Sequence, residues 1–359
     1  MKKNHPRPVV RAITFLILLT IACLTFATYV GAAEMRKAYI SSQDGSKLYI
    51  VDLSKNSIIK TIDIFTPTPL EKVLPPNIND VLAVGKKIFM TVPGPEISPS
   101  GVNQIKVIDS RSDSIVATLK TGMTPSGLIE YNRKVYVVNR YGSTIQEIDP
   151  ETLRITRTIP FPTPKSVSMN PPLFMEIANG KIYLPFPGGL SRPGGIQILD
   201  LKTGEAREFI DFVPISNYGP LAIKKVGEDK IYLGGASNVA VLNTSTDKIT
   251  KIVSISTKDP YVQSFALYDN KLYTANGVST VSVINTLNDT FIKEIDIGFH
   301  PYAFHQKAGI AATENGVYIA DAGRGLKIID VSADRLSTTL ATEEPIGAIA
   351  IIGDKQVGK

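Results

Sequence analysis

Ile145-Gln146-Glu147-Ile148-Asp149 is one of seven similar stretches in this chain. Each stretch closes on Asp or Asn, and aliphatic residues stand one and four places before the closing residue. The copies occupy residues 48–52, 105–109, 145–149, 196–200, 239–243, 281–285 and 326–330. Short runs rich in β-branched residues are typical of buried strands, so the pattern predicts seven equivalent strands.

The closing Asp or Asn of each copy is interpreted as a turn residue. Its side chain can accept a backbone N–H about two residues further on, which shapes a tight turn. A second turn former follows four residues later in six copies: Asn56, Asp113, Gly204, Asp247, Asp289 and Asp334. The third copy has Leu153 at this place. These carboxylates are therefore not counted as catalytic pairs.

An aromatic residue lies in the strand before each copy. The seven are Tyr39, Phe89, Tyr136, Tyr183, Tyr232, Tyr273 and Tyr318. A tyrosine stripe can bind sugars or bases, but one aromatic per repeat in a fixed register favours packing between neighbouring repeats.

Seven prolines repeat with the strands, at intervals of about 40–50 residues: Pro76, Pro125, Pro172, Pro220, Pro260, Pro301 and Pro345. Repeats of this length with about four short strands predict a β-propeller. Residues 345–352 resemble an innermost strand with nothing after it, and the chain from Lys37 onward lacks one. Their pairing would close the ring and remove both free sheet edges. We expect an all-β, seven-bladed β-propeller with four-stranded blades, formed by residues 34–359 as a single domain.

Residues 1–33 have the composition of an export signal. Four basic residues precede an uncharged run of 22 residues, 12–33, which ends in Gly31-Ala32-Ala33. Small residues of this kind suit a signal peptidase, with the mature chain beginning near Glu34. The run is also long enough to span a bilayer of about 30 Å, so an N-terminal membrane anchor remains the alternative. Either reading predicts an exported protein, in the periplasm, at the cell surface or outside the cell.

The charge balance gives no case for nucleic acid. The full chain has 39 Lys and Arg against 33 Asp and Glu, and removal of the four basic leader residues leaves 35 − 33 = +2. The single cysteine, Cys23, lies in the leader, which excludes disulfides and thiolate metal sites from residues 34–359. Metalloprotease, haem-attachment and P-loop motifs are absent, and we expect no cofactor and no metal site.

The motif Val135-Tyr136-Val137-Val138-Asn139 resembles the one that names the YVTN family of seven-bladed propellers. Leu272-Tyr273-Thr274-Ala275-Asn276 and Val317-Tyr318-Ile319-Ala320-Asp321 are looser copies. Gly122-Met123-Thr124-Pro125 and Gly298-Phe299-His300-Pro301 resemble the family's G-x-x-P blade opening. The resemblance implies an exported bacterial or archaeal propeller. One periplasmic member binds single-stranded DNA, and more distant relatives include lactonases and dehydrogenase subunits.

Long Pro- and Gly-rich segments are predicted on one face of the propeller, at residues 65–80, 93–104, 160–173 and 185–195. Long loops on a rigid scaffold usually carry function. Cations and aromatics are expected on the same rim: Arg140, Tyr141, Arg192, Tyr218, Tyr261, His300, Tyr302 and Arg324. Arg and Tyr together suit anions, sugars or stacked bases.

A second candidate site lies on the predicted innermost strands. Asp80, Glu176, Lys224 and His305 each stand four residues after one of the seven prolines. Such a layer in the central channel could form an acid–base site, with Lys224 holding Glu176 ionised.

Three functions follow from these candidates. The leading hypothesis is a non-enzymatic binding module for a protein, polysaccharide, small anionic molecule or other envelope ligand. The alternatives are a lactonase-like hydrolase using the channel residues and, by resemblance, single-stranded nucleic-acid binding. We expect contact with a membrane only through residues 12–33, if they are not cleaved.

Overall fold

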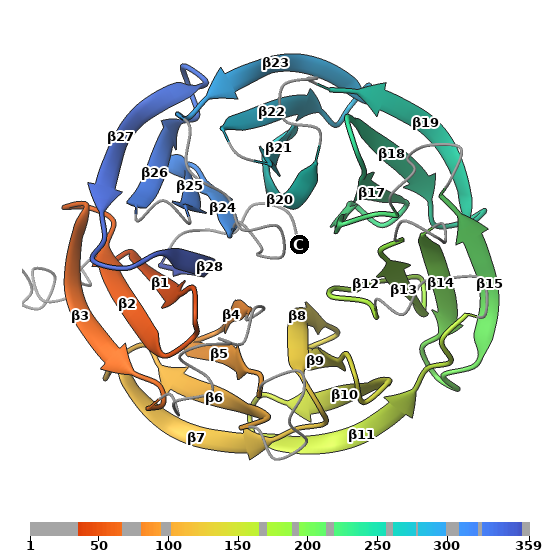
Figure 1. Ribbon diagram of the computed structural model, residues 1–359, viewed down its shortest axis with the longest axis horizontal. Helices are drawn as coiled ribbons and strands as arrows, with labels where there is room; N and C mark the ends of the chain where they lie inside the picture. The colour runs from red at the N-terminus through yellow and green to blue at the C-terminus, as the bar shows by residue number, and fades with distance from the viewer. Residues whose placement is uncertain are drawn as a thin grey trace, which may run out of the picture.

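The computed structural model is a ring of seven four-stranded antiparallel sheets, as predicted (Figure 1). It describes residues 35–66, 80–94, 102–164, 171–188, 194–212, 219–255, 261–277, 279–298, 309–321 and 325–353. Among these residues, no helix is both long enough and apolar enough to cross a bilayer.

Each blade is ordered from the ring centre outward. Blade 1 contains β28 (Ile346–Ile352), β1 (Lys37–Ser42), β2 (Lys47–Asp52) and β3 (Ser57–Asp63). Blade 2 contains β4 (Val81–Val84), β5 (Lys87–Val92), β6 (Gln104–Asp109) and β7 (Ser114–Lys120). Blade 3 contains β8 (Pro125–Tyr131), β9 (Lys134–Asn139), β10 (Thr144–Asp149) and β11 (Arg154–Pro160). Blade 4 contains β12 (Glu176–Ala178), β13 (Lys181–Phe186), β14 (Gly195–Asp200) and β15 (Ala206–Asp211).

The last three blades follow the same order. Blade 5 contains β16 (Ala222–Val226), β17 (Lys230–Gly234), β18 (Asn238–Asn243) and β19 (Lys248–Ser254). Blade 6 contains β20 (Val262–Tyr268), β21 (Lys271–Asn276), β22 (Thr280–Asn285) and β23 (Thr290–Asp296). Blade 7 contains β24 (Ile310–Thr313), β25 (Gly316–Asp321), β26 (Gly325–Asp330) and β27 (Arg335–Ala341).

The ring closes in blade 1, where the last strand of the chain pairs with the first. Lys37 lies opposite Ile352 and Ile40 opposite Ile349 in an antiparallel register. The Ala348 N–H also donates to Ser41 Oγ at 3.0 Å. The closure predicted from the two incomplete termini is therefore confirmed, and β1 has no free inner edge.

The hydrophobic core consists of seven clusters, one between each pair of neighbouring blades. Tyr183 of blade 4, for example, packs with Ile231 and Leu233 of blade 5. All seven predicted aromatic positions are buried, at 0–4% exposure. Packing between repeats is thus confirmed as the role of the aromatic stripe.

The two faces of the ring are built differently. One face, called the turn face, carries the short turns between the first and second and between the third and fourth strands of each blade. The opposite face, called the loop face, carries the connections between the second and third strands and those between blades. Strands that end and begin on the loop face bound the three longest intervals between blades, from Asp63 to Val81, from Pro160 to Glu176 and from Asp296 to Ile310, and the sequence analysis did not single out the last.

The Asp and Asn residues that close each third strand form turns as predicted. In all seven blades the side chain accepts the N–H of the residue two places later, at 2.8–3.0 Å. The second turn position has a positive φ in every blade: Asn56, Asp113, Leu153, Gly204, Asp247, Asp289 and Asp334. Asn, Asp and Gly tolerate this conformation well, which explains their preference there.

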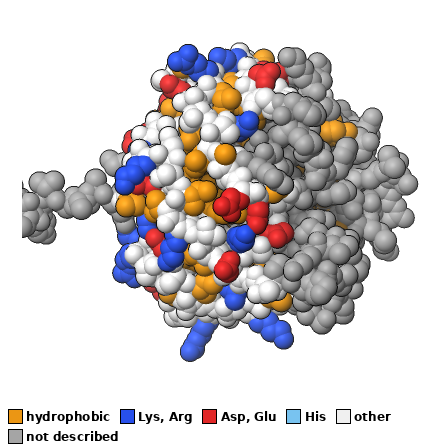
Figure 2. Space-filling view, turned by 60° about the vertical axis from the view of Figure 1, so that its left-hand side comes forward, with side chains coloured by type: hydrophobic (Ala, Val, Ile, Leu, Met, Phe, Trp, Pro, Cys, Tyr) orange, Lys and Arg blue, Asp and Glu red, His pale blue; other side chains and the backbone are white. Residues whose placement is uncertain are grey.

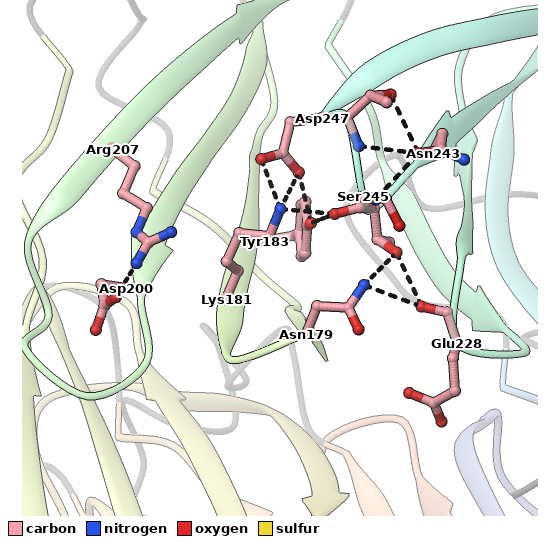
Figure 3. Close-up of polar contacts among 11 residues, drawn as sticks. Asn179, Lys181, Tyr183, Asp200, Arg207, Glu228, Asn243, Ser245 and Asp247 are labelled. Carbon is pink, nitrogen blue, oxygen red and sulfur yellow. Dashed lines mark hydrogen bonds and ion pairs between the residues drawn. The ribbon is translucent and has the colours of Figure 1, made fainter.

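Four of these turns have a second role that the sequence analysis missed. Lys181 Nζ in blade 4 donates to both carboxylate oxygens of Asp247 in blade 5, each at 2.6 Å, and Tyr183 Oη donates to the same carboxylate at 2.7 Å (Figure 3). The arrangement, called here the Lys–Tyr–Asp cluster, recurs at three further interfaces. The other members are Lys37, Tyr39 and Asp113; Lys230, Tyr232 and Asp289; and Lys271, Tyr273 and Asp334.

Both interfaces of blade 3 lack this cluster on the turn face. Toward blade 2, Phe89 has no hydroxyl and Leu153 has no carboxylate, so that only Lys87 Nζ and the exposed Glu151 pair, at 3.2 Å. Toward blade 4, Tyr136 Oη donates instead to Glu147 of its own blade. Arg157 spans the interface with blade 4 by donating to the carbonyl of Leu201 at 2.8 Å.

The outer strand of every blade is protected against edge pairing. All seven contain a β-bulge at the same place, since one residue of each has no partner in the adjacent third strand. On the side of the ring that bears β3 and β27, Lys and Arg side chains are interspersed with acidic and hydrophobic ones (Figure 2). A bulge and mixed charge both disfavour addition of a strand from another chain.

Deletion of residues 345–359 should prevent the ring from closing. It removes β28, whose Ile346, Ile349 and Ile351 are buried. Loss of their burial costs roughly 5–9 kcal/mol, which is comparable to the whole stability of a typical domain. We expect an aggregated product in size-exclusion chromatography. Deletion of residues 354–359 alone is the control, and a 345–359 deletion that melts within a few degrees of the full chain would contradict the closure.

The Lys–Tyr–Asp cluster should contribute measurably to stability. The substitution D247N keeps a residue that tolerates positive φ but leaves the buried Lys181 without its counter-charge. We expect the free energy of unfolding in urea to fall by about 2–4 kcal/mol. D200N is the matched control, because Asp200 bonds its own turn and the exposed Arg207, and it should cause a smaller loss. Equal losses would show that turn formation, and not the inter-blade contact, is what Asp247 supplies.

Candidate functional site

Asp80 and Glu176 face the next blade rather than the middle of the channel. Both are buried, at 7% and 6% exposure. Asp80 Oδ2 accepts the N–H of Leu128 in blade 3 at 3.0 Å, and Oδ1 accepts the N–H of Val81. The Glu176 carboxylate likewise accepts the N–H of Lys225 in blade 5 and that of Ile177. Each carboxylate thereby connects the innermost strands of two neighbouring blades.

The structure brings two of the four predicted channel residues together. Glu176 and Lys224 lie close enough to interact electrostatically. Asp80 belongs to blade 2, two blades away from Glu176, and its carboxylate is bound to blade 3. His305 lies outside the described residues, so its place relative to the others stays a prediction.

The pKa of Glu176 shifts in the direction opposite to the one expected. Burial of the carboxylate raises its pKa, although the positive charge of Lys224 and the hydrogen bond from the Lys225 N–H act to lower it. The sequence analysis considered the nearby lysine but could not anticipate how completely the carboxylate is buried.

Three of the eight predicted rim residues lie in the described part of the chain. Arg140 and Tyr141 are adjacent at the end of β9, and the Arg140 guanidinium carbon lies 5.2 Å from the centre of the Tyr141 ring. Tyr141 is 38% exposed, whereas Arg140 is 7% exposed. Tyr261 is half-buried and forms a β-bridge with Ala236 between blades 5 and 6, away from this pair. The remaining five lie outside the described residues: Arg192, Tyr218, His300, Tyr302 and Arg324.

A network of neutral amides supports Arg140 and Tyr141, and the sequence analysis missed it. Asn103 Oδ1 accepts the N–H of Gly94 at 3.0 Å and that of Thr124 at 2.9 Å, which joins a loop of blade 2 to the entrance of blade 3. The Thr124 carbonyl then accepts the Arg140 N–H at 3.0 Å. This network holds blades 2 and 3 together on the loop face, where their turn-face interface has no Lys–Tyr–Asp cluster.

The Asn139 side chain extends the network within blade 3. Its Nδ2 donates to Thr144 Oγ1 and to Gln146 Oε1, both at 3.1 Å. Gln146 Oε1 also accepts the Gly122 N–H at 3.1 Å, which identifies it as an oxygen and so fixes the orientation of both amides. A Cβ at Gly122 would stand 2.8 Å from Asn139 Cγ, so only glycine fits. This contact gives a physical reason for the glycine of the G-x-x-P opening in blade 3, whereas Gly298, the glycine of the second such opening, has a positive φ of 84°.

Asn139 differs from its counterpart in blade 6 by one missing hydrogen bond. Asn276 Oδ1 accepts a hydrogen bond from the Thr274 hydroxyl at 2.6 Å, and Asn276 Nδ2 donates to the hydroxyls of Thr280 and Ser282. Val137 replaces this threonine in blade 3, and Asn139 Oδ1 is buried with no hydrogen-bond partner among the described residues. Thr124 Oγ1, in the same network, is also buried without one.

No group of three or more His, Cys, Asp or Glu side chains that could hold a metal occurs within the described ranges. The candidate site of the described chain is therefore Arg140 and Tyr141 on their amide support. An exposed aromatic ring beside a cation can stack on a flat or sugar-like ligand and attract a negative charge.

Comparison with known proteins supports the fold. A family model for the LVIVD repeat matches residues 307–335, in blade 7. The search of curated proteins finds no match. Among solved structures, apo AztD from Citrobacter koseri has a TM-score of 0.55 at 11% identity, covering 89% of this chain and 98% of that one.

Two further solved structures show the same ring. A functionally unknown protein from Desulfotomaculum acetoxidans DSM 771 has a TM-score of 0.64 at 14% identity, covering 88% of this chain and 98% of that one. Dihydro-heme d1 dehydrogenase NirN in complex with DHE has a TM-score of 0.55 at 10% identity, covering 88% and 75%. At these identities the likeness establishes a shared architecture only.

Adding the missing hydroxyl should stabilise blade 3. The substitution V137T places Oγ1 where Thr274 has it, next to the unsatisfied Asn139 Oδ1. We expect a gain of about 1 kcal/mol in the free energy of unfolding. The reciprocal change T274V should cost about 1–3 kcal/mol, because it leaves Asn276 Oδ1 buried and unpaired. A loss of stability in V137T comparable to that of T274V would contradict the assignment.

Glu176 should make stability depend on pH. A raised folded-state pKa means that the folded chain binds more protons than the unfolded chain between the ordinary and the raised pKa, so stability falls as pH rises through this window. E176Q, which mimics the protonated acid, should gain stability over wild type as the pH rises above the ordinary glutamate pKa of about 4. Replacing Lys224 by Met should extend the dependence to higher pH, since the charge of Lys224 lowers the pKa of Glu176. A difference between E176Q and wild type that is independent of pH would contradict the shift.

Proposed function

We propose that this chain is an exported, non-enzymatic binding module that holds an envelope ligand on its loop face. The contrast between the faces supports the proposal. Four of the seven blade interfaces are joined by ionic clusters on the turn face, where the connections are short. The long connections, which are free to vary in length without affecting the blades, all belong to the loop face.

The chemistry of Arg140 and Tyr141 indicates the class of ligand. The ring of Tyr141 is exposed, and the buried Arg140 lies beside it with its backbone N–H bound to the Thr124 carbonyl, so the pair is positioned before any ligand arrives. An acidic polysaccharide combines sugar rings that can stack on the exposed Tyr141 ring with carboxylates that the positive charge of the neighbouring Arg140 attracts. We therefore propose an acidic envelope polysaccharide as the ligand class.

Membership of the YVTN family and export are parts of the same proposal. Asn139, the last residue of the YVTN-like motif, lies in the network under the candidate site. The motif would then support the site, because its last residue belongs to the network that positions Arg140 and Tyr141. Residues 1–33 would direct the chain out of the cytoplasm.

The hydrolase hypothesis has weaker support. A buried carboxylate with a raised pKa suits a general acid, and Glu176 has both properties. Its carboxylate nevertheless already accepts two backbone N–H groups, as that of Asp80 does. An inter-blade role accounts for both residues without a substrate.

The test is a titration of the full chain with uronic-acid oligosaccharides and with neutral oligosaccharides of the same length. We expect binding of the acidic set only, and a loss of at least about tenfold in affinity in R140A/Y141A. K55A, which removes an exposed cation from the turn face, should bind as wild type does. Equal binding by R140A/Y141A and wild type would contradict the site, and a preference for single-stranded DNA with a steep salt dependence would favour the nucleic-acid alternative.

A further inference from the structure

The chain enters the propeller on the turn face. The Arg36 carbonyl accepts the Leu53 N–H at 3.0 Å, and Lys37 begins β1 opposite Asp52, at the turn that starts β3. The end of β28 lies at the same place, since a Cβ on Gly353 would stand 3.0 Å from the Met35 carbonyl oxygen. The first residues fixed to the ring are therefore on the side opposite the loop face.

Very little chain separates this point from the apolar run of residues 12–33. From Ala33 to Arg36 the chain advances three residues, which span at most about 11 Å when extended. The six-residue strands that separate the two faces are about 20 Å long. If residues 12–33 span a bilayer, the short connection cannot reach around a blade, and the turn face must lie toward the membrane.

The length of the apolar run favours an anchor over a cleaved signal. As a helix, its 22 residues would extend about 33 Å, close to the 30 Å or so of a bilayer's hydrocarbon core. The apolar region of a signal peptide is typically about 7–15 residues long.

The charges on the turn face are divided between its two halves. The turns that join first and second strands carry Lys86 in blade 2 and Arg133 in blade 3, and Arg36 occupies the same position in blade 1. The corresponding places across the ring are acidic, with Glu228 in blade 5, Asp269 in blade 6 and Glu314 in blade 7. The basic half thus surrounds the point where the chain enters, next to the expected anchor.

We propose that residues 12–33 remain as a membrane anchor and that blades 1–3 rest their basic turns on an anionic bilayer, with the loop face directed away from it. Basic groups close to a membrane are attracted by anionic lipids over a distance of about one Debye length. The acidic turns of blades 5–7 are repelled, so the charge division fixes which side of the turn face lies nearest the lipid. The loop face is then open to ligands in the surrounding medium.

The experiment compares the two ends of one strand of blade 2. In a C23S background, a fluorophore is attached to S112C, in the turn before β7, or to K120C, at the loop-face end of β7; both native side chains are exposed. The full chain is reconstituted into phosphatidylcholine–phosphatidylglycerol vesicles that contain a spin-labelled lipid. We expect quenching at least about threefold stronger at residue 112, because the two sites are separated by roughly 20 Å. Equal quenching, or stronger quenching at residue 120, would overturn the orientation.

Matched charge variants test the basic turns. K86Q/R133Q should weaken quenching at residue 112 by about half, as should vesicles of phosphatidylcholine alone, whereas E228Q/E314Q should leave it unchanged or strengthen it. If quenching at residue 112 were the same in both charge variants and in phosphatidylcholine vesicles, the role of the basic turns would be overturned. Mass spectrometry of protein from native membranes should find the chain intact through Ala33, and cleavage there would overturn the anchor. R140A/Y141A should keep the wild-type quenching pattern, which separates this inference from the ligand proposal.

Discussion

At four of its seven blade interfaces the ring depends on the same contact between neighbouring blades. A turn aspartate in the left-handed conformation presents its carboxylate to a lysine and a tyrosine of the preceding blade, as Asp247 does to Lys181 and Tyr183. Burial and the hydrogen bond to this carboxylate raise the pKa of Tyr183, so that the phenol remains a donor. A single residue therefore lies in a turn of its own blade and also fixes the spacing to the preceding blade.

The two roles of the turn aspartate explain why the sequence predicts the fold well but the contacts between blades poorly. The repeat of Asp and Asn after each third strand is a local pattern, and the turns it predicts all form. The partners of Asp247 lie more than 60 residues earlier in the chain. One signal could have indicated the cluster. A lysine and a tyrosine two residues apart recur at the start of second strands, as Lys181 and Tyr183 in blade 4 and as Lys230 and Tyr232 in blade 5.

The candidate channel site shows the same limit. Counting four residues from each proline correctly placed Asp80 and Glu176 at equivalent positions on, or next to, innermost strands. It could not tell which way their side chains point, because a strand alternates its two sides from one residue to the next. The carboxylates bind backbone N–H groups of the next blade, where strand edges leave donors that no sheet partner satisfies.

Blade 3 is joined to blade 2 by hydrogen bonds on the loop face and not by a Lys–Tyr–Asp cluster on the turn face. Its turn-face interfaces have no Lys–Tyr–Asp cluster, and its loop-face contact with blade 2 depends on neutral amides of Asn103, Asn139 and Gln146. Neutral amides hold their partners by hydrogen bonds and add no net charge of their own to the site. A blade secured from the loop side holds Arg140 and Tyr141 on a rigid base. The departures of blade 3 from the common repeat thus coincide with the place where we propose that the ring binds its ligand.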